Sequence, residues 1–202
     1  MGAGRLEAFS DGVIAVAITL LVLQIAVPTH LHDHSLAHAL LTNWSHYAAY
    51  VVSFMTIGII WINHHAMISR LSQVDHTILL LNLFLLMTIA VLPFATDLIA
   101  TYLREPTGHS TAACIYAGSF LVMSWAFGAL NAHILMRKEH LLDKRIPLQE
   151  RRQILRAAAI GTIPYVAAVG LAFVSAYLTL GICAAVAVYY AMPAASRRAF
   201  AS

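Results

Sequence analysis

Residues 5–28 read RLEAFSDGVIAVAITLLVLQIAVP, and this stretch decides the fold class. From Leu6 to Pro28 it is long enough to cross the hydrocarbon of a bilayer as a helix, which takes about 20 residues. The rest of the chain has the same character, with 60% hydrophobic and only 10% charged residues among 202 and a mean hydropathy of +0.77. A soluble domain carries about 25% charged residues to cover its core. We therefore predict an all-α polytopic membrane protein.

Six apolar stretches are long enough, or nearly so, to act as spans. The last two belong to one apolar run over residues 157–192, which is too long for a single span and which we divide at a turn near 176–181. We predict one six-helix transmembrane domain over residues 1–202, with spans at about 6–28, 44–67, 77–102, 110–136, 157–175 and 178–195.

The basic residues indicate the orientation, because loops rich in Lys and Arg stay in the cytoplasm. With six spans, only Arg104 falls on the side opposite the termini. The other eleven fall on the N-terminal side: Arg5, Arg70, Arg137, Lys138, Lys144, Arg145, Arg151, Arg152, Arg156, Arg197 and Arg198. We expect both termini in the cytoplasm. Because the basic residues are spread over loops and ends, we expect membrane lipid rather than nucleic acid as a partner.

Outside the predicted spans, the loop over residues 29–43 holds His30, His32, His34 and His38. Histidines at this spacing form either a weak transition-metal site or a pH-responsive polar loop. We predict no metal site, because nothing in the sequence fixes a geometry. The chain also lacks the His-Glu-x-x-His, Gly-x-Ser-x-Gly and phosphate-binding glycine motifs of enzymes. We therefore predict neither catalysis nor a cofactor.

Polar residues at membrane depth are functional candidates, because they are costly to place in lipid. The first span carries Asp11 near its start, and the second ends with the sequence WINHH at residues 61–65. These helices run antiparallel, so both clusters lie near the cytoplasmic boundary. We expect Asp11 to meet His64 or His65, with Arg5 beside them, as a polar clamp between the two helices. A proton relay through the same groups is the alternative.

A helical wheel separates a second face of the first span. At about 100° per residue, Val16, Leu20 and Leu23 fall within roughly 60° of one another, with Gly12 and Thr19 beside them. Asp11 lies about 140° from Val16 on the same wheel. Spacing alone makes this apolar stripe an ordinary lipid-facing or packing surface.

The opening residues resemble the signature of a known family. The pattern Arg5-x-x-x-Phe9-Ser10-Asp11-Gly12-Val13, continued by the apolar run to Leu23, is similar to the endolysosomal potassium channel family, transmembrane protein 175, in its bacterial single-repeat form. Trp61 with His64 and His65 fits the same pattern. The specific part of the resemblance is the first span and the end of the second.

The resemblance implies a potassium-permeable cation channel, whose pore is lined by first helices and narrowed by apolar side chains. This fold differs from that of ordinary potassium channels. Carried over by position, the constrictions fall on Val16, Leu20 and Leu23, with Thr19 as the adjacent hydroxyl. Val16 is smaller than the isoleucine or leucine usual at the first constriction. The implied structural polar layer comprises Arg5, Phe9, Ser10, Asp11, Trp61, Asn63, His64 and His65.

The Phe-Ser-Asp triplet occurs once in this chain, whereas animal members of the family carry two copies of the six-helix unit. The resemblance therefore implies a homotetramer around one pore, in the plasma membrane of a bacterium, with potassium as the permeant ion. The competing function is a proton-coupled secondary transporter that uses Asp11 and His64 or His65. Pro93 and Pro164 are weak candidates for the helix breaks that a transporter would have. A membrane scaffold without conduction is a third hypothesis.

Overall fold

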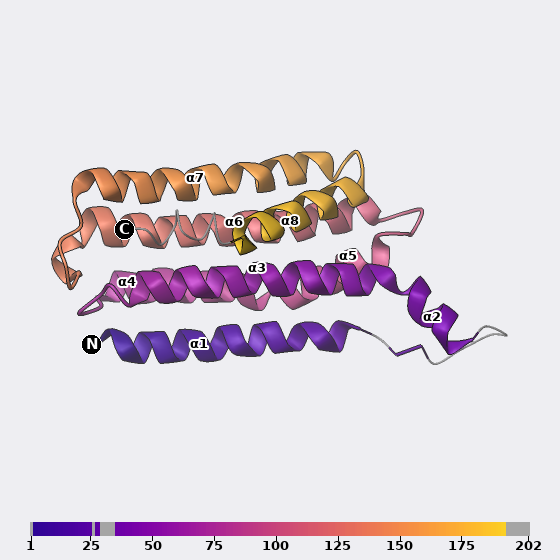
Figure 1. Cartoon of the computed structure of the whole chain (residues 1–202), viewed down its shortest axis with the longest axis horizontal. Coiled ribbons are helices and arrows are strands. Elements are labelled where there is room, and N and C mark those ends of the chain that lie inside the picture. The colour runs from indigo at the N-terminus through magenta and orange to yellow at the C-terminus, as the bar shows by residue number, and fades with distance from the viewer. Residues whose placement is uncertain (1, 26, 29–34, 193–202) are drawn as a thin grey trace.

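The structure is a computed structural model that describes residues 2–25, 27–28 and 35–192. Within these ranges the regular structure is helical, apart from two isolated β-bridges. The elements, shown in Figure 1, are α1 (Ala3–Leu20), the 3-10 turn η1 (Leu21–Gln24), α2 (Leu36–Thr42), α3 (Trp44–Ile68), α4 (His76–Ala90), α5 (Leu92–Tyr102), α6 (His109–Arg137), the 3-10 turn η2 (Glu139–Leu141), α7 (Leu148–Leu171) and α8 (Ala176–Ala191).

Five helical segments in the described ranges are long and apolar enough to cross a membrane: Ala3–Gln24, Trp44–Ile68, His76–Tyr102, His109–Arg137 and Leu148–Leu171. The shorter helix α8 is also apolar. Large apolar side chains such as Phe94, Ile160 and Phe173 are more than 60% exposed on the outside of the bundle. Water would penalise such a surface, whereas lipid accepts it. The chain is therefore an all-α, multi-pass membrane protein.

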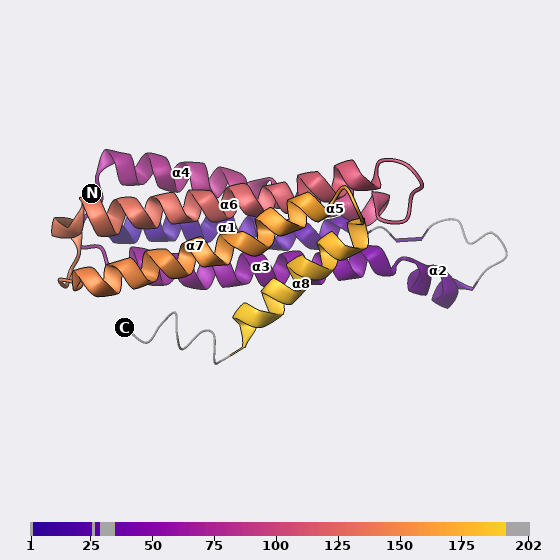
Figure 2. The same cartoon turned by 90° about the horizontal axis from the view of Figure 1, so that it is seen from above.

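The long helices lie side by side and alternate in direction along the chain (Figures 1 and 2). Helix α1 lies at one edge of the bundle and packs mainly on α3 and α4. Helix α6 lies inside and contacts α4, α5, α7 and α8. Helix α8 crosses the bundle obliquely (Figure 2). The core between these helices includes fully buried Ile57, Leu85 and Phe120.

The third predicted span, 77–102, is two helices in the structure. Helix α4 ends at Ala90 and α5 begins at Leu92, with Val91 between them. Pro93 lies in the first turn of α5, and proline has no backbone N–H to continue the hydrogen-bond ladder of the preceding helix. The break is not matched in α7, where Pro164 lies inside a continuous helix.

Helix α7 begins earlier than the fifth predicted span, 157–175. It starts at Leu148, so the charged residues at 150–156, which lie before the predicted span, form its first turns. One of them anchors this extension: Arg151 donates to the backbone oxygens of Ile146 at 2.7 Å and Leu135 at 3.1 Å, and pairs with Glu139. The following turn ends at Ser175, whose side chain caps α8.

The loops at the end of the bundle that carries the N terminus are joined to one another. The Ser72 amide donates to the Leu141 carbonyl, and the Asp143 amide donates to the Arg70 carbonyl, both at 2.9 Å. Lys138 and Asp75 form an ion pair of 2.8 Å. The loop between α3 and α4 is thereby fastened to the loop between α6 and α7.

Candidate functional site

Helix α1 buries one stripe and leaves another uncovered. Its buried residues are Leu6, Ser10, Ile14 and Ala17, which recur at helical spacing. The predicted stripe lies outside this set: Val16 is 58% exposed, Leu20 41% and Leu23 72%. The rest of the protomer therefore anchors α1 but does not cover these three side chains.

Leu23 belongs to a 3-10 turn rather than to the α-helix that the sequence analysis assumed. Helix α1 ends at Leu20, and η1 continues over Leu21–Gln24. In a 3-10 helix, side chains three residues apart eclipse one another. Leu23 consequently lies over Leu20, which makes the stripe straighter at this end than a wheel at 100° per residue predicts.

Two further residues on the uncovered side of α1 are Phe9 and Thr19. Phe9 is 54% exposed and, with Val16 and Leu20, lines a shallow groove that reaches Ala90 at the end of α4. It thus lies on the apolar side of the helix instead of joining the polar layer. The Thr19 hydroxyl donates to the Ala15 and Val16 carbonyls of its own helix at 2.9 Å.

Direct polar contacts join α1 to α3. The Trp61 indole Nε1 donates to Asp11 Oδ1 at 2.8 Å. One turn earlier on α1, Glu7 Oε1 lies 2.9 Å from His65 Nδ1. Asp11 therefore meets the tryptophan rather than a histidine, and the histidine at 65 is paired with an acid that the sequence analysis did not single out.

A buried hydrogen-bonded chain joins α1, α4 and α3. Asn82 donates through Nδ2 to Ser10 Oγ at 3.0 Å, and its oxygen lies 2.7 Å from His64 Nε2. Ser10 in turn donates to the Leu6 carbonyl at 2.9 Å. Because the Asn82 oxygen is an acceptor, His64 carries its proton on Nε2. Ser10, His64 and Asn82 are each at most 1% exposed, so this chain is shielded from solvent and lipid.

Two members of the predicted polar layer lie apart from it. Asn63 donates to the Ile59 carbonyl of its own helix at 2.8 Å and faces a cavity on another side of α3. Arg5 is exposed, and the described residues include no ion-pair partner for it. Sequence reasoning missed Glu7 and Asn82. Glu7 precedes Asp11 by four residues and so lies near it on the helix, and Asn82 is a lone amide in an apolar span. Both residues could therefore have been identified from the sequence as candidates.

Most of the histidine loop cannot be compared with this site. His30, His32 and His34 lie outside the described residues. His38 is exposed near the start of α2. No group of three side chains suited to a metal ion occurs in the described part of the chain.

The sequence was compared with known families and proteins, and it matches one family. The family model described as endosomal/lysosomal potassium channel TMEM175 matches residues 5–93. A potassium channel of Streptomyces collinus is 47% identical over 187 residues, which cover 93% of this chain and 90% of that protein. The chain belongs to the TMEM175 family. A second bacterial TMEM175 relative, a potassium channel of Chamaesiphon minutus, is 39% identical over 94% of this chain and 93% of its own length.

The TMEM175 fold extends over nearly the whole chain. The crystal structure of a lysosomal potassium-selective channel TMEM175 homolog from Chamaesiphon minutus matches with a TM-score of 0.84 and 38% identity, covering 94% of this chain and 96% of that one. TMEM175 of Mus musculus, named an endosomal/lysosomal proton channel, is 31% identical over 63% of this chain and 28% of its own length. This chain is therefore a bacterial-type member of a family of ion channels rather than enzymes.

Proposed function

We propose that this protein is a potassium-permeable cation channel, in which α1 helices from four identical chains surround one pore. The observation that carries the proposal is the exposure of Val16, Leu20 and Leu23 along one line of an otherwise anchored helix. A stripe that lines a pore must point at the pore axis, which requires a fixed rotation of the helix. Here polar contacts from two neighbouring helices fix that rotation.

A closed ring of four chains supplies the walls that one chain lacks. Each chain has a single α1, and its uncovered stripe needs partners on the other sides to enclose a path. Closed cyclic rings are a common form of symmetric oligomer. The shallow groove beside the stripe, from Phe9 to Leu20 with Ala90 opposite, is the surface against which a neighbouring α1 would pack.

The proposed mechanism is a hydrophobic constriction. A narrow apolar neck resists ions because it dewets and because a passing ion sheds water. Rings of Val16, Leu20 and Leu23 form three such necks, and Val16 leaves the widest because its side chain is the smallest. Thr19 lies beside them with its proton donated to the helix backbone, so its oxygen lone pairs are available to a cation. Discrimination between ions then rests on neck radius and dehydration cost.

The polar layer acts in this proposal as the fixed end of the pore helix. Asp11, Ser10 and Glu7 all lie in the first half of α1 and contact Trp61, Asn82 and His65 respectively. In the second half, Thr19 bonds only to its own helix. Opening would therefore move the Leu20 and Leu23 end more than the Asp11 end.

We place the protein in a bacterial plasma membrane with both termini in the cytoplasm. In this proposal the five long apolar segments and the shorter apolar helix α8 act as six crossings. The orientation rests on the basic residues, of which all but Arg104 then fall on the N-terminal side. Potassium is the permeant ion by analogy with the bacterial relatives named potassium channels, and the proposal includes no cofactor.

The alternative is a proton-coupled transporter that uses Asp11 with His64 or His65. Its proton path would need these groups in contact, whereas Asp11 is bonded to Trp61, and His64 to Asn82. A transporter would also need paired helix breaks, and of Pro93 and Pro164 only Pro93 interrupts a helix. These contacts favour the channel.

Recording from purified protein in planar bilayers under a potassium gradient separates the two functions. A channel gives unitary potassium current steps that grow with voltage. Saturable flux that depends on a pH gradient, without unitary steps, would contradict the proposal in favour of the transporter. Native mass spectrometry of the same preparation should give a complex of four chains, and a stable dimer or monomer that conducts would refute the ring.

A further inference from the structure

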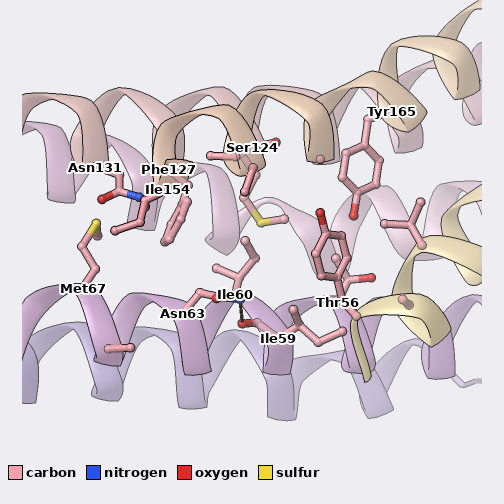
Figure 3. A pocket seen from close by; sticks show the side chains of 18 of the residues that line it. Thr56, Ile59, Ile60, Asn63, Met67, Ser124, Phe127, Asn131, Ile154 and Tyr165 are labelled. Atoms are coloured by element: carbon pink, nitrogen blue, oxygen red, sulfur yellow. Dashed lines mark hydrogen bonds between the residues drawn. The ribbon is translucent and has the colours of Figure 1, made fainter. Parts of the chain in front are cut away.

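A cavity of about 260 Å³ lies within the protomer, on the side of α3 away from α1. It is lined by α3, α6, α7 and α8 and is partly open to the outside, and Figure 3 shows side chains from facing helices pointing into it. The cavity-facing residues of α3 include Thr56, Ile60, Asn63 and Met67. They recur at helical spacing, whereas Trp61, His64 and His65 face α1 or α4. One helix thus separates the cavity from the pore helix.

Two buried polar side chains point into this cavity without a partner. Asn131 on α6 is 6% exposed and Tyr165 on α7 is 7% exposed, and both line the space. No hydrogen bond from either side chain to another described residue is present. They lie toward opposite ends of the cavity (Figure 3). A buried amide or hydroxyl without a partner costs about 1–3 kcal/mol, so an occupant that offers each group a hydrogen bond is stabilised in the cavity.

A third polar group, the Tyr190 hydroxyl, joins them from α8. The Tyr190 hydroxyl reaches across to α7, where a Cβ added to Gly161 would lie 2.5 Å from it. Gly161 therefore leaves the room that brings this hydroxyl to the cavity wall. The structure gives the Tyr190 hydroxyl no hydrogen-bond partner among the described residues either.

Most of the remaining wall is apolar, with Ile60, Met123, Phe127 and Val186 among its members. The polar side chains of Thr56, Asn63 and Ser124 also line it, and each is hydrogen-bonded within the bundle. Water alone suits such a space poorly, because each buried water needs two to four polar partners. The two charged residues in its lining, Arg70 and Glu150, have opposite signs. The interior therefore matches an uncharged molecule with an apolar middle and hydrogen-bonding groups at both ends.

We propose that this cavity is a binding site for a small, uncharged amphiphile, held by hydrogen bonds to Asn131 and Tyr165 at its two ends. An occupant presses on the α3 face that is opposite the contacts to α1. Its presence therefore changes how firmly Trp61 and His65 hold the pore helix, and so changes the current. This last step rests on the proposed channel function, whereas the binding site itself does not.

The test uses tritiated para-(hydroxypropyl)phenol, which has a hydroxyl at each end and an apolar middle, with the full-length protein in lipid nanodiscs. We expect saturable binding of one molecule per chain, displaced by unlabelled compound. The analogue para-propylphenol, which lacks the second hydroxyl, should bind roughly tenfold more weakly because one hydrogen bond is lost. Non-saturable uptake of both compounds, as into empty nanodiscs, would overturn the site.

Matched variants locate the binding. Ala158→Phe fills the cavity from α7 and should abolish saturable binding, whereas Ala159→Phe, at the adjacent exposed position outside the cavity, should preserve it. Tyr165→Phe keeps the ring and should weaken binding roughly tenfold, with Tyr189→Phe as the matched exposed control. Binding that persists unchanged in both Ala158→Phe and Tyr165→Phe would refute the proposal.

Currents are then measured with and without the same compound. We expect it to change the open probability of the wild type and of Ala159→Phe but not of Ala158→Phe. Because binding is measured without an ion gradient, the outcomes separate: binding without any potassium current refutes the channel and leaves the site standing. Unitary currents without saturable binding refute the binding site and leave the channel standing. Binding with unaltered currents refutes the coupling through α3.

Discussion

The indole nitrogen of Trp61 lies 2.8 Å from Oδ1 of Asp11 and donates a hydrogen bond to it across the α1–α3 contact. This bond holds the acidic side of α1 toward α3. The apolar stripe, about 140° away from Asp11 on the helix, is thereby turned outward from the protomer. The rotation of the helix thus depends in part on a bond at Asp11, about two and a half turns before Leu20, the nearest leucine of the stripe.

Removing this bond should destabilise the protein. Asp11→Leu and Trp61→Phe should each lower the free energy of unfolding by about 1–3 kcal/mol, because the acceptor is a carboxylate. The double variant should lose less than the sum, as expected for residues in contact. Unfolding in detergent–SDS mixtures measures all three, and Asp11→Asn, which keeps an acceptor oxygen, is the control. Strict additivity would show that the bond carries no energy.

Smaller side chains in the stripe should widen the proposed pore. Leu20→Ala and Leu23→Ala should each raise single-channel conductance on the order of twofold and lower the preference for potassium over sodium, because the apolar neck becomes wider and wetter. Val22→Ala, also exposed but on a different side of the same turn, should leave both quantities unchanged. If only the Val22 variant alters the currents, α1 lines the pore with another face or not at all.

Breaking the buried chain should cost more than removing a neighbouring amide. Asn82→Leu leaves the buried His64 ring without its partner, whereas Ser10 still donates to the Leu6 carbonyl, so the expected cost is about 1–3 kcal/mol for one unsatisfied group. Asn63→Leu removes an amide that bonds only to its own helix, and should change stability by less than about 1 kcal/mol. Thermal unfolding of the two purified variants compares them, and equal melting temperatures would contradict the structural role of Asn82.

The loop ion pair predicts a pH dependence. The hydrogen bond from Lys138, and then that from the Ile78 amide, hold the pKa of Asp75 below its ordinary value of 3.8. Because the folded-state pKa is the lower one, the stabilisation is complete above 3.8 and is lost as the pH falls through the folded pKa. Asp75→Asn keeps the cap on α4 and removes the charge.

Comparing the two proteins across pH checks the sign. At pH near 7 the Asp75→Asn variant should be less stable by under about 1 kcal/mol, since the pair lies at the surface. The difference should disappear in strongly acidic solution, where the wild-type carboxyl is also protonated. Asp143→Asn, a nearby carboxyl without an ion pair among the described residues, is the control. A difference that grows on acidification would contradict the assignment.

The sequence predicted the apolar stripe because the period of an α-helix alone places Val16 and Leu20 together. It did not predict the position of Leu23, because the change to 3-10 winding depends on how η1 packs against α3 and α5. The partners of the polar layer were partly wrong for the same reason. Which histidine meets which acid is decided by the relative rotation and translation of packed helices, to which α4 contributes Asn82.

The helix boundaries, too, are only partly predictable from the sequence. Pro93 marks the break between α4 and α5 in the sequence itself, because proline lacks the backbone N–H that a continuing helix needs. The first turns of α7 carry charges that look like a loop, and they are helical because Arg151 is bonded to the end of α6. Long-range contacts of this kind leave no periodic trace in the sequence.

The 3-10 turn at the end of α1 makes the outermost neck of the proposed pore mechanically separate from the innermost one. It is closed by short-range bonds such as that from the Ile25 amide to the Val22 carbonyl, 3.1 Å long. Rewinding this single turn as α-helix changes the twist by about 20° per residue. Leu23 would then swing through about 60° while Val16 stays where it is. A stimulus acting on the Leu23 end of the proposed pore could therefore change the twist of this one turn without moving the rest of α1.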